Sequence, residues 1–234
     1  MTYFPKLSNL PPLTAWSYSR YNTYTTCPMK FAYTVLLKMQ DPKPKGPALL
    51  RGIDIHKEGE LYLIAPKKPR KVPASYQHFA EEMEQLRTMS PAVEQQWGFT
   101  QSWEPTGWFS GNTWVRNVLD VSVQYPDDTA LVIDFKTGKK YGSNEDQMKL
   151  FALVTFKKFP NLKEVSTRLW YLDIADANEN EVEHTYKVAE APAIQRDWEK
   201  KVKPMFNDRK FPPRPGRYCQ WCFLSKAEGG PCKY

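Results

Sequence analysis

The sequence predicts an α/β (α+β) protein in which helices flank a central mixed sheet, and three observations lead to this fold class. Residues 118–124 and 130–136 are rich in β-branched and aliphatic side chains, and the turn formers of residues 125–129 separate them, so they predict a β-hairpin. A helix is expected around Gln147, followed by a strand over residues 165–174. This strand, helix and strand predict a crossover connection, which places two parallel strands in the same sheet.

The elements before the hairpin follow from caps, helix breakers and hydrophobic spacing. The segment from Ser17 to Tyr21 offers N-caps for a helix that runs toward Thr26, and Cys27–Pro28 interrupts that helix. Further elements are expected in this order: a helix over residues 48–63, a basic proline-rich connector over residues 66–73, a helix over residues 76–89 and a strand over residues 93–103.

The elements after the hairpin are read in the same way. Ser143, with Asp146 three residues later, is close to a capping box for the helix around Gln147. A strand is expected over residues 183–188. Pro192 then begins the last helix, and Pro204 is expected to end it.

The composition favours an anionic partner. The chain has 234 residues, 33 Lys and Arg against 26 Asp and Glu, and a net charge of +7, and nucleic acid is the commonest partner of such proteins. Eight Trp residues suit base stacking, although most tryptophans lie in protein cores. The chain lacks an apolar run of about 18 residues and a signal-peptide apolar region, so we expect no membrane span and a cytoplasmic location.

Three charged residues of the hairpin form the first candidate site. If the turn is centred on Asp127, Asp120 faces Asp134 across the two strands, and opposed Cβ atoms lie about 5 Å apart. Lys136 is two residues from Asp134 and therefore points to the same face. Two carboxylates this close repel each other, and a hard divalent cation would explain them. The plain alternative is a hairpin with surface acids and a lysine.

The cysteines form the second candidate site. Cys27 lies near the start, and Cys219, Cys222 and Cys232 lie near the end. In a reducing compartment this distribution favours a bound metal over disulfides. Four thiolates fit either a structural zinc or a [4Fe–4S] cluster, and four unrelated thiols are the remaining alternative.

Glu94, on the strand before the hairpin, could add a further carboxylate to the first site.

The placement of Asp120 and of Asp134-Phe-Lys136 on paired strands resembles the Asp…(Asp/Glu)-x-Lys signature of the PD-(D/E)XK nuclease superfamily. The sequence from Gln147 to Phe151 is similar to the Gln-x-x-x-Tyr motif of the RecB-like branch, with Phe in place of Tyr. The resemblance implies a restriction-endonuclease-like core, with catalytic roles for both aspartates, Lys136 and Gln147.

The first part of the chain adds two more resemblances to this branch. Gly52 to His56 resembles its Gly-x-x-x-His motif, which implies that His56 binds the catalytic Mg²⁺ or Mn²⁺ together with the two aspartates and the Phe135 carbonyl. A lone histidine is otherwise a packed or solvated residue. The segment from Ser19 to Tyr33 resembles the family's opening segment, and its candidate DNA contacts are Arg20, Tyr21 and Tyr24. The alternative for Arg20 is a solvated helix face.

One cysteine before the core and three after it resembles the iron–sulfur nucleases of this branch, including the CRISPR-adaptation exonucleases and the AddB-type nuclease domains. It is this resemblance that selects a [4Fe–4S] cluster over zinc, in a subdomain formed by both chain ends. It implies one nuclease domain over residues 1–234 with three parts. These are an N-terminal helical part over residues 15–64 with Cys27 and His56, a nuclease core over residues 93–190, and a cysteine tail over residues 205–234.

The resemblance implies a metal-dependent DNA exonuclease, acting on single-stranded ends in recombination, repair or CRISPR-type processing. Protein partners in recombination or CRISPR adaptation would fit it, as would a phage-encoded enzyme in the host cytoplasm. Two alternatives stay open: a non-catalytic iron–sulfur or zinc DNA-binding module, and an inactive nuclease-fold subunit of a helicase or integrase assembly.

Overall fold

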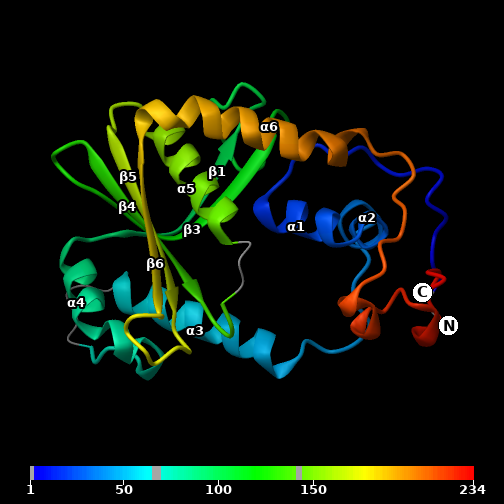
Figure 1. Ribbon diagram of the computed structural model, residues 1–234, viewed down its shortest axis with the longest axis horizontal. Helices are drawn as coiled ribbons and strands as arrows, with labels where there is room; N and C mark the ends of the chain where they lie inside the picture. Colours follow the sequence, from blue (N-terminus) through cyan, green and yellow to red (C-terminus); the bar gives the residue numbers. More distant parts are fainter. Residues whose placement is uncertain (1–2, 65–69, 141–143) are drawn as a thin grey trace. The chain divides into compact units, whose positions relative to one another are not determined.

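The computed structural model describes residues 3–64, 70–140 and 144–234 (Figure 1). The chain divides into two compact units. The terminal unit consists of Met1–Lys45 and Trp198–Tyr234, and the central unit of Gly46–Asp197. Cys27 and His56, which the sequence placed in one N-terminal part, therefore belong to different units. The expected cap at Ser143 and the first half of the basic connector lie outside the described residues.

The central unit contains a six-stranded mixed sheet with the strand order β2-β1-β3-β4-β5-β6 (Figure 1). The strands are β1 (Ala92–Phe99), β2 (Pro105–Thr106), β3 (Val115–Gln124), β4 (Thr129–Lys136), β5 (Glu164–Tyr171) and β6 (Glu181–Lys187). β4 and β5 are parallel, and the other neighbours are antiparallel. The predicted fold class and the predicted crossover are confirmed.

The β3–β4 hairpin has the expected register. Gln124 pairs with Ala130, and the pairing runs to Val121 and Ile133. At the turn, the Tyr125 N–H donates to the Thr129 carbonyl at 2.9 Å. The register carries Asp120 and Asp134 to the end of the paired region, where β3 and β4 begin to separate.

Helices cover both faces of this sheet. On β4, Leu131, Ile133 and Phe135 belong to a buried cluster with α3 (Pro47–Leu63), the 3₁₀ helix η2 (Ala74–Phe79) and α4 (Ala80–Thr88). The alternate side chains of β4 point the opposite way, toward the crossover helix α5 (Asn144–Lys158). Because α5 is buried over most of its length, it holds Gln147 firmly in its first turn.

Two predicted boundaries differ from the structure in the segment before the hairpin. The helix expected over residues 76–89 is divided into η2 and α4, because Phe79 leaves the helical region at φ −124° and ψ 30°. The strand expected over residues 93–103 ends at Phe99. A turn follows, in which the Trp103 N–H donates to the Thr100 carbonyl and Trp103 adopts a φ of 62°.

The terminal unit is helical. It contains α1 (Tyr18–Thr26), α2 (Pro28–Phe31), the π-helix η1 (Ala32–Leu36) and the last part of α6 (Ala191–Asn207), followed by the 3₁₀ turns η4 (Arg217–Trp221) and η5 (Lys226–Glu228). Ser17 caps α1, as predicted. The expectation that Pro204 ends the last helix is wrong. Proline removes one N–H donor, but the helix continues to Asn207, and the Asp208 N–H still donates to the Pro204 carbonyl at 2.9 Å.

Across the described ranges, every helix is too short or too polar to cross a membrane.

Candidate active site

Three side chains from three different elements meet at the point where β3 and β4 separate. One ligand atom each from His56 (α3), Glu94 (β1) and Asp120 (β3) lies within 4.8 Å of the other two. His56 Nδ1 is 3.3 Å from Asp120 Oδ2. One imidazole nitrogen and two carboxylates are a donor set that suits a divalent cation.

Asp120 is fixed by the backbone of the neighbouring strand. Its Oδ2 accepts a hydrogen bond of 2.7 Å from the Phe135 N–H, just beyond the last paired residues of the hairpin. The Asp120 carboxylate thus takes the place of a backbone hydrogen bond between β3 and β4 where the two strands separate. The Phe135 N–H acts here as a donor to Asp120, and metal binding by the Phe135 carbonyl stays a prediction.

Asp134, Lys136 and Gln147 form a hydrogen-bonded group beside the three ligands. The Lys136 ammonium lies 2.5 Å from Asp134 Oδ2 and donates to Gln147 Oε1 at 2.8 Å. The Gln147 amide donates to Asp134 Oδ1 at 3.2 Å. Asp134 Oδ2 is buried and, apart from its close approach to Lys136, has no hydrogen-bond donor among the described residues. Such an atom is available to a cation.

The electrostatics of the site show an excess of negative charge. Burial raises the pKa of Asp134 to about 6, the Lys136 ammonium opposes this rise, and the Asp120 carboxylate adds to it. Burial and Asp120 also raise the pKa of Glu94. For His56, burial lowers the pKa, but the hydrogen bond to Asp120 and the surrounding acids outweigh it and leave the pKa raised. A bound cation would offset both the burial of these carboxylates and the repulsion between them.

Among the residues of the site, Glu94 has the weakest signal in the sequence. It lies between the pairs Val93–Val121 and Gln95–Leu119, next to Asp120 on the neighbouring strand. Its φ of 50° is uncommon for a residue with a side chain, and strained backbone of this kind is concentrated at functional sites. No local sequence pattern encodes this conformation, so its position near His56 could be found only from the structure.

Close packing of α3 on the sheet positions His56. A Cβ atom at Gly59 would collide with the Tyr76 ring and hydroxyl and would lie 3.1 Å from the Phe135 ring. The Tyr76 hydroxyl donates to the Ile55 carbonyl at 2.9 Å, one residue before His56. The glycine therefore lets α3 approach Phe135 closely enough for His56 to reach Asp120.

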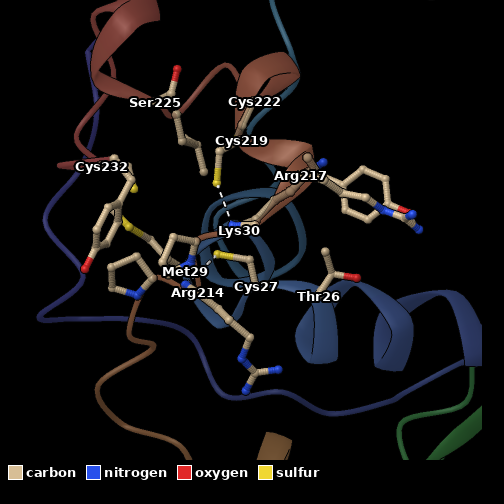
Figure 2. A pocket seen from close by; sticks show the side chains of 16 residues that line it. Thr26, Cys27, Met29, Lys30, Arg214, Arg217, Cys219, Cys222, Ser225 and Cys232 are labelled. Carbon is tan, nitrogen blue, oxygen red and sulfur yellow. Dashed lines mark hydrogen bonds between the residues drawn. The ribbon is translucent and has the colours of Figure 1, made fainter.

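The four cysteines lie together within the terminal unit. Cys27 and the tail residues Cys219, Cys222 and Cys232 line one cavity of about 260 Å³ (Figure 2). All four are free thiols. Among the described residues, which include these four, the one group of three candidate ligands within 4.8 Å of one another is the histidine–carboxylate group. Among the described residues, no three of the four thiols therefore lie within 4.8 Å of one another.

Two of the thiols accept backbone hydrogen bonds, whereas burial disfavours the thiolate form of a third, Cys222. Cys27 Sγ accepts from the Arg214 N–H at 3.4 Å, and Cys219 Sγ accepts from the Gly216 N–H at 3.3 Å. Burial raises the pKa of Cys222, the nearby thiols of Cys27 and Cys219 raise it further, and the Lys30 ammonium partly opposes the rise. Bound metal would reverse this effect, because coordination deprotonates a thiol.

The three candidate DNA contacts near the N-terminus each make contacts within the terminal unit. Arg20 donates to the Ala15 carbonyl at 2.7 Å. The Tyr21 ring packs edge-on against Trp198 at 5.3 Å, and the Tyr24 hydroxyl donates to Asp208 at 2.9 Å. These contacts give the three residues structural roles, and DNA binding by them stays a prediction.

The chain belongs to the PD-(D/E)XK nuclease superfamily, which it matches over residues 15–226. This membership supports a nuclease and implies a DNA substrate, and members of the superfamily usually use divalent metals. No curated protein matches the chain.

The solved structures that are similar to it include the following two. One is the "Putative exonuclease" from Eubacterium rectale, with 14% sequence identity and a TM-score of 0.47, covering 92% of this chain and 86% of that chain. The other is SSO0001, with 12% identity and a TM-score of 0.40, covering 97% of this chain and 91% of that chain.

Proposed function

We propose that the protein is a metal-dependent DNA exonuclease of the RecB-like iron–sulfur branch, acting on single-stranded ends. One observation carries this proposal. His56, Glu94 and Asp120 converge on one point of the sheet, beside the linked group of Asp134, Lys136 and Gln147. Burying several acidic side chains costs free energy unless they are paired or bind a metal, so a purely structural sheet is not expected to contain this group.

The residues of the site divide into two groups by what they can do. His56, Glu94 and Asp120 would hold a divalent cation, and the buried Oδ2 of Asp134 would be a further oxygen ligand. Mg²⁺ or Mn²⁺, when bound, supplies Lewis-acid activation of water and of the phosphodiester. The imidazole favours Mn²⁺ more than an all-oxygen site would.

Lys136 and Gln147 act on the substrate side of the site. The Lys136 ammonium has three N–H donors, of which two point to Asp134 and Gln147, so one remains to stabilise negative charge on a phosphate oxygen or to orient water. Gln147 holds both partners in place, because its amide binds Asp134 and its carbonyl binds Lys136. Phe151 replaces the tyrosine of the branch motif, so any contribution of that hydroxyl is missing here.

Cys27, Cys219, Cys222 and Cys232 would hold a [4Fe–4S] cluster. The spacing of the thiols supports a cluster over zinc. In a tetrahedral zinc site with bonds of about 2.3 Å, the sulfur atoms lie roughly 4 Å apart, whereas no three of these thiols are within 4.8 Å of one another among the described residues. A cluster spaces its ligands more widely because each thiolate binds a different iron atom.

The resemblance to the RecB-like branch supports the finer parts of the proposal. Single-stranded ends, a cytoplasmic location, a phage origin and partners in recombination, repair or CRISPR adaptation all come from the Gly52–His56, Gln147 and cysteine motifs.

Digestion of end-labelled DNA tests the proposal. Purified protein with Mg²⁺ or Mn²⁺ is expected to shorten linear single strands from an end, to leave circular single strands intact, and to be inactive in chelator. Cutting of the circles at the same rate as linear strands would make the enzyme an endonuclease. The absence of cutting with either metal would contradict the proposed activity.

A further inference from the structure

The loop that follows β2 presents two aromatic rings beside an arginine of β3. The guanidinium carbon of Arg116 lies 5.6 Å from the centre of the Trp108 ring and 5.9 Å from the centre of the Phe109 ring. Both distances are within the range of cation–π contact. Trp108 is half-buried, whereas Phe109 is 86% exposed. We call Trp108, Phe109 and Arg116 the aromatic–arginine cluster.

The loop holds Phe109 in a defined position. The buried Thr113 hydroxyl bonds to the Gly107 carbonyl at 2.7 Å and to the Ser110 carbonyl at 2.8 Å, and the Ser110 N–H donates back to Gly107. The loop also lies close to β1 because Gly98 has no side chain: a Cβ there would be 3.0 Å from the Gly107 carbonyl. The hydrogen-bonded loop therefore holds the exposed Phe109 ring in one position. Because the loop is already ordered, binding a ligand there would cost little further conformational entropy.

Arg116 is a cation without a counter-charge in the described part of the chain. None of the ion pairs among the described residues includes it, and its buried Nε has no hydrogen-bond partner. A guanidinium in this state is suited to an anionic ligand, and phosphate matches its planar donors.

The aromatic–arginine cluster lies on the same two strands as the candidate metal ligands. Gly98 pairs with Arg116 and Gln96 with the exposed Val118, and Glu94 and Asp120 lie two residues further along. Four residues of strand separate Arg116 from Asp120, which is roughly 13 Å at 3.3 Å per residue. Stacked bases advance about 3.4 Å each and extended strands more, so this distance corresponds to roughly two to four nucleotides.

We propose that the aromatic–arginine cluster binds single-stranded DNA a few nucleotides from the scissile phosphate, with a base stacked on Phe109 and a phosphate held by Arg116. The inference rests on the proposed nuclease function and adds a positioning site to it. Stacking requires an unpaired base with a free face, so the cluster selects single strands over duplex. Stacking on aromatic side chains tolerates any base, which suits an enzyme that degrades DNA of any sequence.

Binding and hydrolysis, measured separately, test the inference with the full-length protein. Binding of a labelled 12-nucleotide strand and of a blunt duplex is followed by fluorescence anisotropy in chelator. Hydrolysis of bis(p-nitrophenyl) phosphate with Mn²⁺ reports on the catalytic site alone, because this molecule is too small to reach Phe109. The variants are Phe109→Ala, Phe109→Trp and Arg116→Gln, and Met89→Ala removes another exposed apolar side chain of the central unit as the control.

We expect Phe109→Ala and Arg116→Gln to weaken single-strand binding by roughly tenfold each, which is within the range for loss of one stacked base. Duplex binding and bis(p-nitrophenyl) phosphate hydrolysis should stay unchanged, Phe109→Trp should restore binding, and Met89→Ala should match the unaltered protein. Unchanged single-strand binding in Phe109→Ala, or an equal loss for duplex, would overturn the inference.

The same data separate this inference from the proposed function. If the unaltered protein hydrolyses neither DNA nor bis(p-nitrophenyl) phosphate, the nuclease proposal fails, while single-strand binding that depends on Phe109 still supports the cluster. If hydrolysis is normal and binding does not depend on Phe109, the cluster fails and the nuclease proposal stands.

Discussion

At the residue scale, the central contact of the site joins the His56 side chain of α3 to the Asp120 side chain of β3. The imidazole reaches the Asp120 carboxylate at 3.3 Å, and that carboxylate is held in turn by the Phe135 N–H at 2.7 Å. Each group limits the freedom of the next, so the site is preorganised before any cation binds.

Replacing His56 tests whether it is a ligand. His56→Ala should weaken Mn²⁺ binding by roughly tenfold or more, since loss of a ligand or of its support has such an effect at metal sites. Isothermal titration with Mn²⁺ measures the change, and His78→Ala, an exposed histidine of η2, is the matched control. If His56→Ala leaves the titration unchanged, His56 is a packing residue.

Asp208 makes the terminal unit sensitive to acid. Burial raises its pKa, but hydrogen bonds from the Phe211 and Lys210 N–H groups and from the Tyr24 hydroxyl outweigh burial and leave the pKa lowered. Its ionised form therefore stabilises the fold above the unfolded pKa of about 3.9, and this stability is lost as the pH falls through the lower folded value.

Substitutions at this site should show that pH dependence. Asp208→Ala is expected to lower the unfolding free energy by about 1 kcal/mol at pH 7, by loss of its hydrogen bonds. The difference from the unaltered protein should shrink below pH 4, and Tyr24→Phe, which removes one donor, should cost less. Urea unfolding between pH 3 and 7 measures both. A deficit in Asp208→Ala that is equally large at pH 3 would contradict this account.

At the scale of elements, the distance of α3 from the sheet depends on one glycine. Gly59→Ala places a methyl group against Tyr76 and Phe135, and overpacking of this kind costs about 1–3 kcal/mol. Because His56 lies one turn earlier on α3, Mn²⁺ binding should weaken together with thermal stability. Gly111→Ala is the control, because a Cβ at Gly111 would meet no atom within 4 Å. Gly59→Ala with unchanged melting temperature and metal affinity would show that α3 is not held by this contact.

Elements whose signals are local could be predicted from the sequence, and those that depend on distant contacts could not. The hairpin register followed from the turn at Asp127, and the parallel crossover followed from a strand, a helix and a strand. The position of Glu94 depends on a φ of 50°, and the end of β1 depends on a turn at Trp103 with φ 62°. Neither conformation has a signature in neighbouring residues.

Part of the candidate site could also be predicted. The spacing of Asp134 and Lys136 determines that they share a face, and their contact at 2.5 Å agrees with it. The aromatic–arginine cluster was not predicted, because Phe109 and Arg116 meet only when a loop returns to its neighbouring strand. Pro204 misled the helix boundary because proline disfavours a helix without excluding it.

At the scale of the whole molecule, the four cysteines come from both ends of the chain, so the proposed cluster would connect those ends. A cluster that joins Cys27 to Cys219 closes nearly the entire chain into a loop. Closure of so long a loop by a covalent link restrains the unfolded state by about 4–5 kcal/mol in the analogous case of a disulfide. The terminal unit should therefore depend on the cluster for its stability.

Anaerobic purification tests the cluster directly. The protein should be brown, and replacing any one of Cys27, Cys219, Cys222 or Cys232 by Ala should remove the colour and much of the solubility. Thr26→Ala, at the edge of the same cavity, should keep both. Colourless protein with one bound zinc would refute the cluster and retain the four-thiol site, whereas full solubility of all four variants would refute the site.

The central claim is that the buried carboxylates at the end of the hairpin bind metal for phosphodiester hydrolysis. The most direct measurement compares Mn²⁺-dependent digestion of an end-labelled single strand by Asp134→Asn and by Asp127→Asn, an exposed acid at the other end of the same hairpin. We predict that Asp134→Asn loses cutting and still binds the strand in chelator, because the acid holds metal rather than DNA, and that Asp127→Asn stays active. Full digestion by Asp134→Asn would contradict the account.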